Sequence, residues 1–123
     1  MNIRGIRGAT TINTDAKADV LSATRELLDA ILKSNPELKT DDISSVIFTT
    51  TEDIISAYPA LAARQMGWDL VPMMCACEIP VPDSLPRCIR VLIHWNTEKE
   101  QSAIKHVYLH DAAKLRPDLV ARA

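Results

Sequence analysis

The ten residues Cys88–Thr97, CIRVLIHWNT, alternate between an apolar set of side chains and a set that contains an arginine. The apolar set comprises Ile89, Val91, Ile93 and Trp95. Successive side chains of a β-strand point to opposite faces, so a period of two places each set on its own face. The pattern predicts a strand whose apolar face lies in a core and whose opposite face carries Arg90.

Four other segments have the β-branched or alternating composition of strands. They span residues 2–12, 46–50, 71–79 and 105–110. In the first of them Arg7 shares a face with small neighbours, and Ile6 lies on the other face. In the last, Tyr108 lies on a polar face, opposite Val107. The strands therefore present polar side chains on the side away from their apolar residues.

Two segments have the features of helices. Over residues 15–35 apolar side chains recur at helical spacing, and Pro36 ends the pattern because the residue before a proline avoids the α region. Pro59 suits a first helical turn and Gly67 suits the position just after a helix end. These signals predict a long helix and a short helix over residues 59–66.

The order of these elements predicts an α+β fold in which helices cover one face of a single mixed sheet. The uncovered face would carry Arg90 and Tyr108, and a large exposed face of this kind is costly for a monomer. We therefore expect a homo-oligomer.

The composition is that of one globular domain over residues 1–123. The chain is 47% hydrophobic and 24% charged, with a formal net charge of -2 and scattered lysine and arginine. A nucleic-acid-binding protein usually carries a basic stripe, which this sequence lacks. It also lacks a signal peptide and the apolar run of about 20 residues that a membrane span needs, so we expect a cytoplasmic protein.

The sequence lacks the signatures of covalent, metal and nucleotide chemistry. It has no G-x-S-x-G elbow and no motif that ties a cysteine to a histidine. Cys75, Cys77 and Cys88 lack a fourth ligand at zinc-site spacing, and we expect free thiols that pack as small apolar side chains. The residues RGIRGATT (4–11) lack the glycine spacing of a phosphate loop. We expect no metal and no cofactor.

Four polar residues stand out from β-sequence: Arg7, Glu78, Arg90 and Tyr108. Each has an ordinary explanation when taken alone. Strand arginines are usually solvated or paired, Glu78 can pair with one of them, and Tyr108 can be half-buried with its hydroxyl in water. These residues indicate a site only when they are taken together with the rest of the chain.

Ordered motifs run along nearly the whole chain. They are RGIRGATT (4–11), YPA (58–60), VP (71–72), CIRV (88–91), HVYL (106–109) and LRPDL (115–119). Together with Arg64, Gly67-Trp68 and Cys75-x-x-Glu78, they resemble the AroH-class chorismate mutases, the type known from Bacillus, over residues 3 to 119. Several motifs in one order make this resemblance specific.

The resemblance implies an assembly and a reaction. Three copies are expected to form a trimer with a pseudo-α/β-barrel centre and active sites in clefts between adjacent subunits. The reaction is the intramolecular [3,3] rearrangement of chorismate to prephenate, an isomerisation in the shikimate pathway at the branch to phenylalanine and tyrosine. It proceeds without a nucleophile, a metal or a cofactor.

The resemblance also assigns catalytic roles to Arg90, Glu78 and Arg7. Arg90 matches an arginine beside the ether oxygen, where a fixed cation stabilises the negative charge that develops as the carbon–oxygen bond breaks. Arg7 and Tyr108 match the groups that hold the enolpyruvyl carboxylate in a reactive geometry. Glu78 matches the carboxylate that accepts a hydrogen bond from the ring hydroxyl.

Ten further positions match the substrate pocket or its mouth. They are Tyr58, Ala60, Arg64, Met73, Met74, Cys75, Ala76, Cys77, Leu115 and Arg116. Two departures from the Bacillus type occur, because Leu61 replaces a lysine and Met73-Met74 replaces a Val-Thr pair. The leucine at position 61 removes a cation from the site, and the two larger methionines narrow the substrate pocket.

Two alternatives remain open at the level of sequence. Trimeric imine deaminases of the Rid group also bind carboxylates in interfacial clefts, although this chain lacks a match to their motifs. A binding module that senses an aromatic metabolite without turning it over would keep the same four polar residues.

Overall fold

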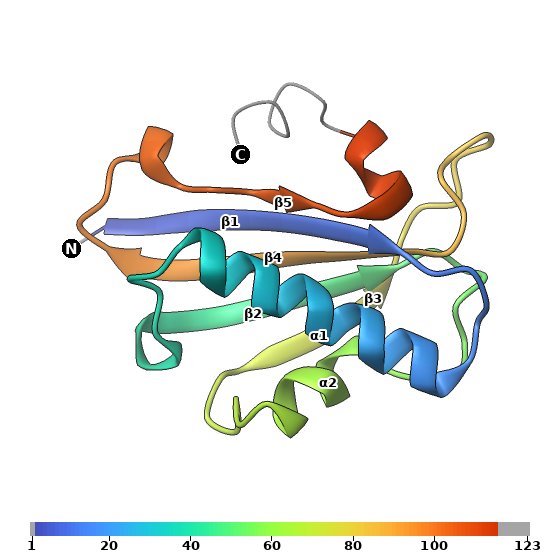
Figure 1. The fold of residues 1–123 in the computed structure, drawn as a ribbon, viewed down its shortest axis with the longest axis horizontal. Helices are drawn as coiled ribbons and strands as arrows, with labels where there is room; N and C mark the ends of the chain where they lie inside the picture. The colour runs from blue at the N-terminus through green and yellow to red at the C-terminus, as the bar shows by residue number, and fades with distance from the viewer. Residues whose placement is uncertain (1, 116–123) are drawn as a thin grey trace.

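Cys88–Thr97 forms β4, the middle strand of a five-stranded sheet in the computed structural model, which describes residues 2–115. The other strands are β1 (Asn2–Thr11), β2 (Ile43–Thr50), β3 (Met73–Cys77) and β5 (Val107–Tyr108). The sheet order is β3-β2-β4-β1-β5 (Figure 1). β4 pairs antiparallel with β1 and β2, whereas the two edge strands pair in parallel, so the sheet is mixed as predicted.

Two helices cover one face of this sheet, α1 (Lys17–Ser34) and α2 (Pro59–Gln65) (Figure 1). The apolar stripe of α1, which includes Leu27, Leu28 and Ile31, packs on Ile6 and Phe48 in the main core. Short 3₁₀ helices span Thr40–Asp42 (η1), Gln101–Ala103 (η2) and His110–Lys114 (η3). Within residues 2–115, no helix has the length and apolar character to cross a membrane. The predicted α+β fold with helices on one face is confirmed.

The boundaries of β2, β3 and β5 differ from those predicted by two residues or more. β5 has two residues instead of six, because His110 adopts a positive φ of 53° and begins η3. β3 begins only after Pro72, which lacks a ladder donor. β2 begins at Ile43, three residues before the predicted strand. Two polar serines occupy this first part, so the hydrophobic pattern does not indicate a strand there.

Gly8 of β1 lies directly under α1, where a larger side chain has no room. A Cβ atom at this position would lie 2.8 Å from Ile31 Cδ1, 3.1 Å from Val91 Cγ1 and 3.2 Å from Leu27 Cδ1. The small residue therefore lets the helix approach the sheet closely, next to the position of Arg7.

Gly8→Ala is expected to lower the free energy of unfolding by about 1–3 kcal/mol, because overpacking a close-packed core displaces its neighbours. Urea denaturation measures this change. Gly5→Ala is the matched control, since a Cβ there meets only Leu92 Cδ1 at 3.4 Å, an ordinary contact. Equal stability of the two variants would contradict the close approach of α1 to β1.

The face of the sheet away from the helices carries two rows of side chains set by strand pairing. One row runs through Met74, Ile47, Leu92 and Arg7. The next row runs through Ala76, Thr49, Arg90, Ala9 and Tyr108. We call this surface the open face. Met74 is 68% exposed and Ile47 37% exposed, so apolar area reaches the surface there.

Candidate active site

Arg90 forms an ion pair with Glu78 on the open face. Its Nε lies 3.0 Å from Glu78 Oε2, and the Thr49 hydroxyl donates a hydrogen bond of 2.7 Å to the same oxygen. The backbone N–H of Glu78 donates to Thr50 O, which continues the β3–β2 pairing and fixes where this side chain starts. The site therefore has a guanidinium held by a carboxylate that is itself held by the sheet.

The Arg90 side chain is 31% exposed and that of Glu78 is 15% exposed. Arg90 Nε is buried and lies outside hydrogen-bond geometry despite its ion pair. A guanidinium has five donors, and the partial exposure leaves part of the group accessible to a bound anion. The arrangement can present a fixed positive charge to a ligand on the open face.

Tyr108 lies in the same row of the open face as Arg90, with Ala9 between them, in a small cluster separate from the main core. The cluster contains Ala9, Cys88 and Ala112, with Leu85 and Leu115 packed against it. Tyr108 is only 6% exposed, and its hydroxyl is buried without a hydrogen-bond partner among the described residues. The ordinary explanation of Tyr108, a half-buried residue with its hydroxyl in water, is therefore wrong. A buried hydroxyl without a partner costs about 1–3 kcal/mol, which a ligand oxygen can recover.

The Cys88 thiol is next to this charge and stays protonated. Burial raises the pKa of Cys88 to about 11, and the positive charge of Arg90 opposes the shift only in part. All three cysteines are free thiols, as expected. We expected the three cysteines to pack as small apolar side chains. Cys88 is buried and Cys75 is half-buried, as expected, whereas Cys77 is exposed.

Arg7 lies on the open face of β1, one register step from Arg90. Its direct neighbour on β4 is Leu92, whereas Arg90 faces Ala9. Such diagonal positions are within reach of one another for long side chains. The backbone N–H of Arg7 donates to His106 Nδ1 (2.9 Å), which ties β1 to the segment before β5.

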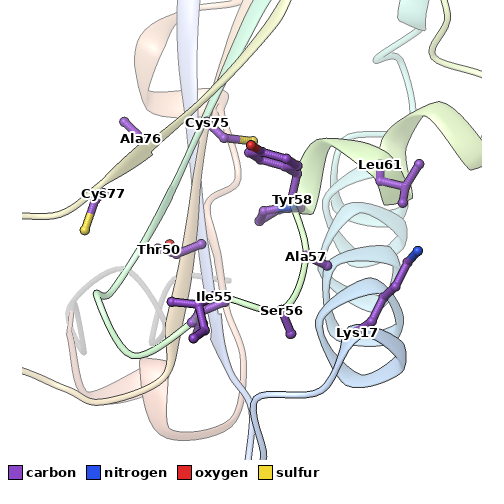
Figure 2. A pocket seen from close by; sticks show the side chains of 12 residues that line it. Lys17, Thr50, Ile55, Ser56, Ala57, Tyr58, Leu61, Cys75, Ala76 and Cys77 are labelled. Carbon is purple, nitrogen blue, oxygen red and sulfur yellow. The ribbon is translucent and has the colours of Figure 1, made fainter.

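A pocket of about 470 Å³ opens at the edge strand β3, between that strand, the segment after β2 and the start of α2 (Figure 2). Four of the predicted site residues line it: Tyr58, Cys75, Ala76 and Cys77. Leu61 of α2 also contributes to the wall. Three of these residues come from β3, and Glu78, the partner of Arg90, directly follows that strand.

The remaining predicted residues have varied positions. Ala60 is buried in the main core, Arg64 is exposed on α2, Met73 is half-buried against the core, Met74 is exposed on the open face, and Leu115 packs against the Tyr108 cluster. Arg116 lies outside the described residues. In one protomer the predicted residues therefore form two groups. We call them the arginine group (Arg7, Glu78, Arg90, Tyr108) and the pocket group (Tyr58, Cys75, Ala76, Cys77).

Comparison with known proteins identifies the family. The model of a family described as chorismate mutase type I matches residues 3–119. The chain belongs to the type I chorismate mutases.

Relatives within this family of chorismate mutases cover almost the whole chain. The chain is 52% identical over 117 residues to the chorismate mutase AroH of Thermus thermophilus, covering 95% of this chain and 96% of that protein. It is 41% identical over 120 residues to the AroH of Bacillus subtilis, covering 97% and 94%. A solved chorismate mutase from Clostridium thermocellum superposes with a TM-score of 0.87 at 47% identity, covering 89% of this chain and 97% of that one. The resemblance to the AroH class is confirmed.

Two features around the site of this chorismate mutase family member were not predicted. Thr49, which holds Glu78, lay in a strand-like run that gave no sign of a polar role. Asp15 binds the segment after β2: its carboxylate accepts hydrogen bonds from Ile55 N (3.1 Å), Ser56 N (3.2 Å) and Ser56 Oγ (2.6 Å). These partners are about 40 residues away in sequence, so no local pattern could link them.

Asp15→Ala is expected to lower the unfolding temperature at pH 7. The Ser56 hydroxyl and the Ile55 N–H hold the pKa of the Asp15 carboxyl below its usual value of 3.8. A lowered pKa means that the stabilisation is complete above that value and is lost as the pH falls below it through the lowered pKa. Thermal unfolding at pH 7 and at about pH 2 measures the effect. Asp29→Ala, on the α1 helix that follows Asp15, is the control, and a pH-independent difference for Asp15→Ala would contradict this role.

Proposed function

We propose that this protein is a chorismate mutase that converts chorismate to prephenate in phenylalanine and tyrosine biosynthesis in the cytoplasm. One observation carries the proposal: a chain of this family holds the Arg90 guanidinium in place through Glu78, in the same row of the open face as Tyr108, whose buried hydroxyl lacks a partner among the described residues. These groups suit a small anion that carries both carboxylate and hydroxyl oxygens.

Arg90 is the group that stabilises the transition state. As the ether bond of chorismate breaks ahead of carbon–carbon bond formation, negative charge develops on the ether oxygen and the enolpyruvyl fragment. A permanently charged guanidinium fixed beside that oxygen binds the transition state better than the substrate, which lowers the barrier. The reaction needs no proton transfer, and a Cys88 thiol with a raised pKa is no nucleophile at neutral pH.

The other members of the arginine group orient the substrate. Arg7 and the Tyr108 hydroxyl hold the enolpyruvyl carboxylate over the ring, so that the two reacting carbons meet. Glu78 accepts a hydrogen bond from the ring hydroxyl, and its negative charge favours the partial positive charge of the ring. An acceleration of about 10⁶-fold requires about 8 kcal/mol, of which one fixed charge supplies about 3–4 and orientation the rest.

We further propose that the active site is complete only between two subunits of a trimer. The open face exposes Met74 and Ile47, which association would bury. Within one protomer the arginine group does not line the pocket that the pocket group forms, and packing two copies would bring the arginine group of one against the pocket group of the next. In that arrangement the pocket closes over the apolar part of the substrate.

The direct test is to mix the purified protein with chorismate and follow the loss of its absorbance. Loss well above the spontaneous rate, with prephenate as the product, supports the proposal. Binding of chorismate without turnover would replace it by a metabolite-sensing function. Neither binding nor turnover, together with hydrolysis of an imine substrate, would point to the Rid-like alternative.

A further inference from the structure

Lys17, the first residue of α1, lines the pocket at the edge of β3 together with Tyr58, Leu61 and Cys75. In Figure 2 its side chain extends from α1 on the same side of the pocket as Leu61. Of the described residues that line this pocket, Lys17 is the one that carries a charge. The remainder of the wall is apolar or neutral, so a ligand anion there meets a single cation.

The start of α1 is fixed against the pocket wall. The three hydrogen bonds that Asp15 accepts from Ile55 and Ser56 join this end of the helix to the segment that also carries Tyr58. Lys17 follows two residues later, so the same contacts keep its backbone close to the wall. Its exposed, flexible side chain is therefore anchored beside the pocket at its base.

Among residues 2–115, no acidic side chain neutralises the charge of Lys17. Across residues 2–115 the ion pairs of the structure join other residues, and no carboxylate pairs with Lys17. An unpaired ammonium beside an apolar pocket attracts carboxylates and raises their local concentration. Because it is compact, hydrated and flexible, it suits capture of an anion better than fixed orientation.

We propose that Lys17 binds a carboxylate of the substrate at the mouth of this pocket. The inference rests on the proposed function, in which the substrate is a dianion with its second carboxylate held by the arginine group. Lys17 contacts the substrate in the ground state and in the transition state alike, since its carboxylate partner takes no part in bond breaking. It therefore contributes to KM and to the rate of capture, and not to kcat.

The test uses the full-length protein with chorismate and four variants. Lys17→Ala and Lys17→Gln are expected to raise KM about five- to tenfold, with kcat within about twofold of the parent. Lys17→Arg keeps the charge and is expected to keep KM within about twofold. Lys33→Ala, at the exposed far end of the same helix, is the matched control and is expected to leave both constants unchanged. The fall of kcat/KM with salt is expected to be shallower in Lys17→Gln than in the parent.

The outcomes separate the two proposals. If the parent does not accelerate chorismate loss, the proposed function fails, whatever the variants do. If the parent is active and Lys17→Gln keeps the parent KM, the charge is not needed and the inference about Lys17 fails. A fall in kcat at unchanged KM, or an equal rise in KM for Lys33→Ala, would overturn it as well.

Discussion

Replacing Arg90 with alanine is expected to lower kcat by about 10²- to 10³-fold. In the proposed mechanism the side chain supplies the fixed positive charge beside the breaking ether bond, and loss of one such preorganised group costs about 2.7–4 kcal/mol of transition-state stabilisation. Because Glu78 then remains without the ion pair that Arg90 provides, KM is expected to rise too. Steady-state kinetics with chorismate measures both constants.

Arg25→Ala is the control for this prediction. Arg25 is exposed on α1 and donates a hydrogen bond to Gln65, so its loss removes the same charge from the chain at a distance from the site. The kcat of the Arg25→Ala variant is expected to stay within about twofold of the parent value. A folded Arg90→Ala protein with unchanged kcat would remove Arg90 from its catalytic role.

Replacing Glu78 with alanine is expected to lower kcat/KM by about 10- to 100-fold. The carboxylate pairs with Arg90 and accepts a hydrogen bond from the Thr49 hydroxyl. Its removal therefore frees the guanidinium and takes away the acceptor that we propose for the ring hydroxyl of the substrate. Hydrogen bonds that involve charged groups contribute about 1.5–3 kcal/mol each, which sets this range.

Two comparisons sharpen the Glu78 prediction. Glu26→Ala removes a carboxylate that pairs with His110 on the surface and is expected to leave kcat/KM unchanged. Glu78→Gln keeps an acceptor but loses the charge, so it is expected to fall between the parent and Glu78→Ala. Kinetic constants of Glu78→Ala that match those of Glu26→Ala would remove Glu78 from its proposed role.

Much of the fold follows from local sequence patterns. The alternation in Cys88–Thr97 identifies β4 with its boundaries, and the helical spacing over residues 15–35 identifies α1. Both patterns arise because one face of each element is buried in the same core. The start of β2 at Ile43 was missed, because its serines are polar and their strand conformation depends on pairing with β4. The local composition gives no information about this pairing with a strand that is distant in sequence.

The same distinction applies to the site. Alternation alone places Arg90 on the face opposite Ile89, and the family resemblance adds Glu78 from another strand. The pairing of Arg90 with Glu78, the supporting hydroxyl of Thr49 and the burial of the Tyr108 hydroxyl depend on the order β3-β2-β4-β1-β5. Contacts between strands that are distant in sequence set these features, so they become visible only in three dimensions.

A comparison of Arg90→Lys with Arg90→Met tests most directly whether a positive charge at this position drives the reaction. Both replacements have long side chains without the guanidinium fork, and only lysine keeps the charge. With both variants folded and in the same oligomeric state, kcat for chorismate loss under saturating substrate is the quantity to measure. Electrostatic stabilisation predicts that Arg90→Lys is at least about tenfold faster than Arg90→Met. Equal kcat values for the two variants would contradict it.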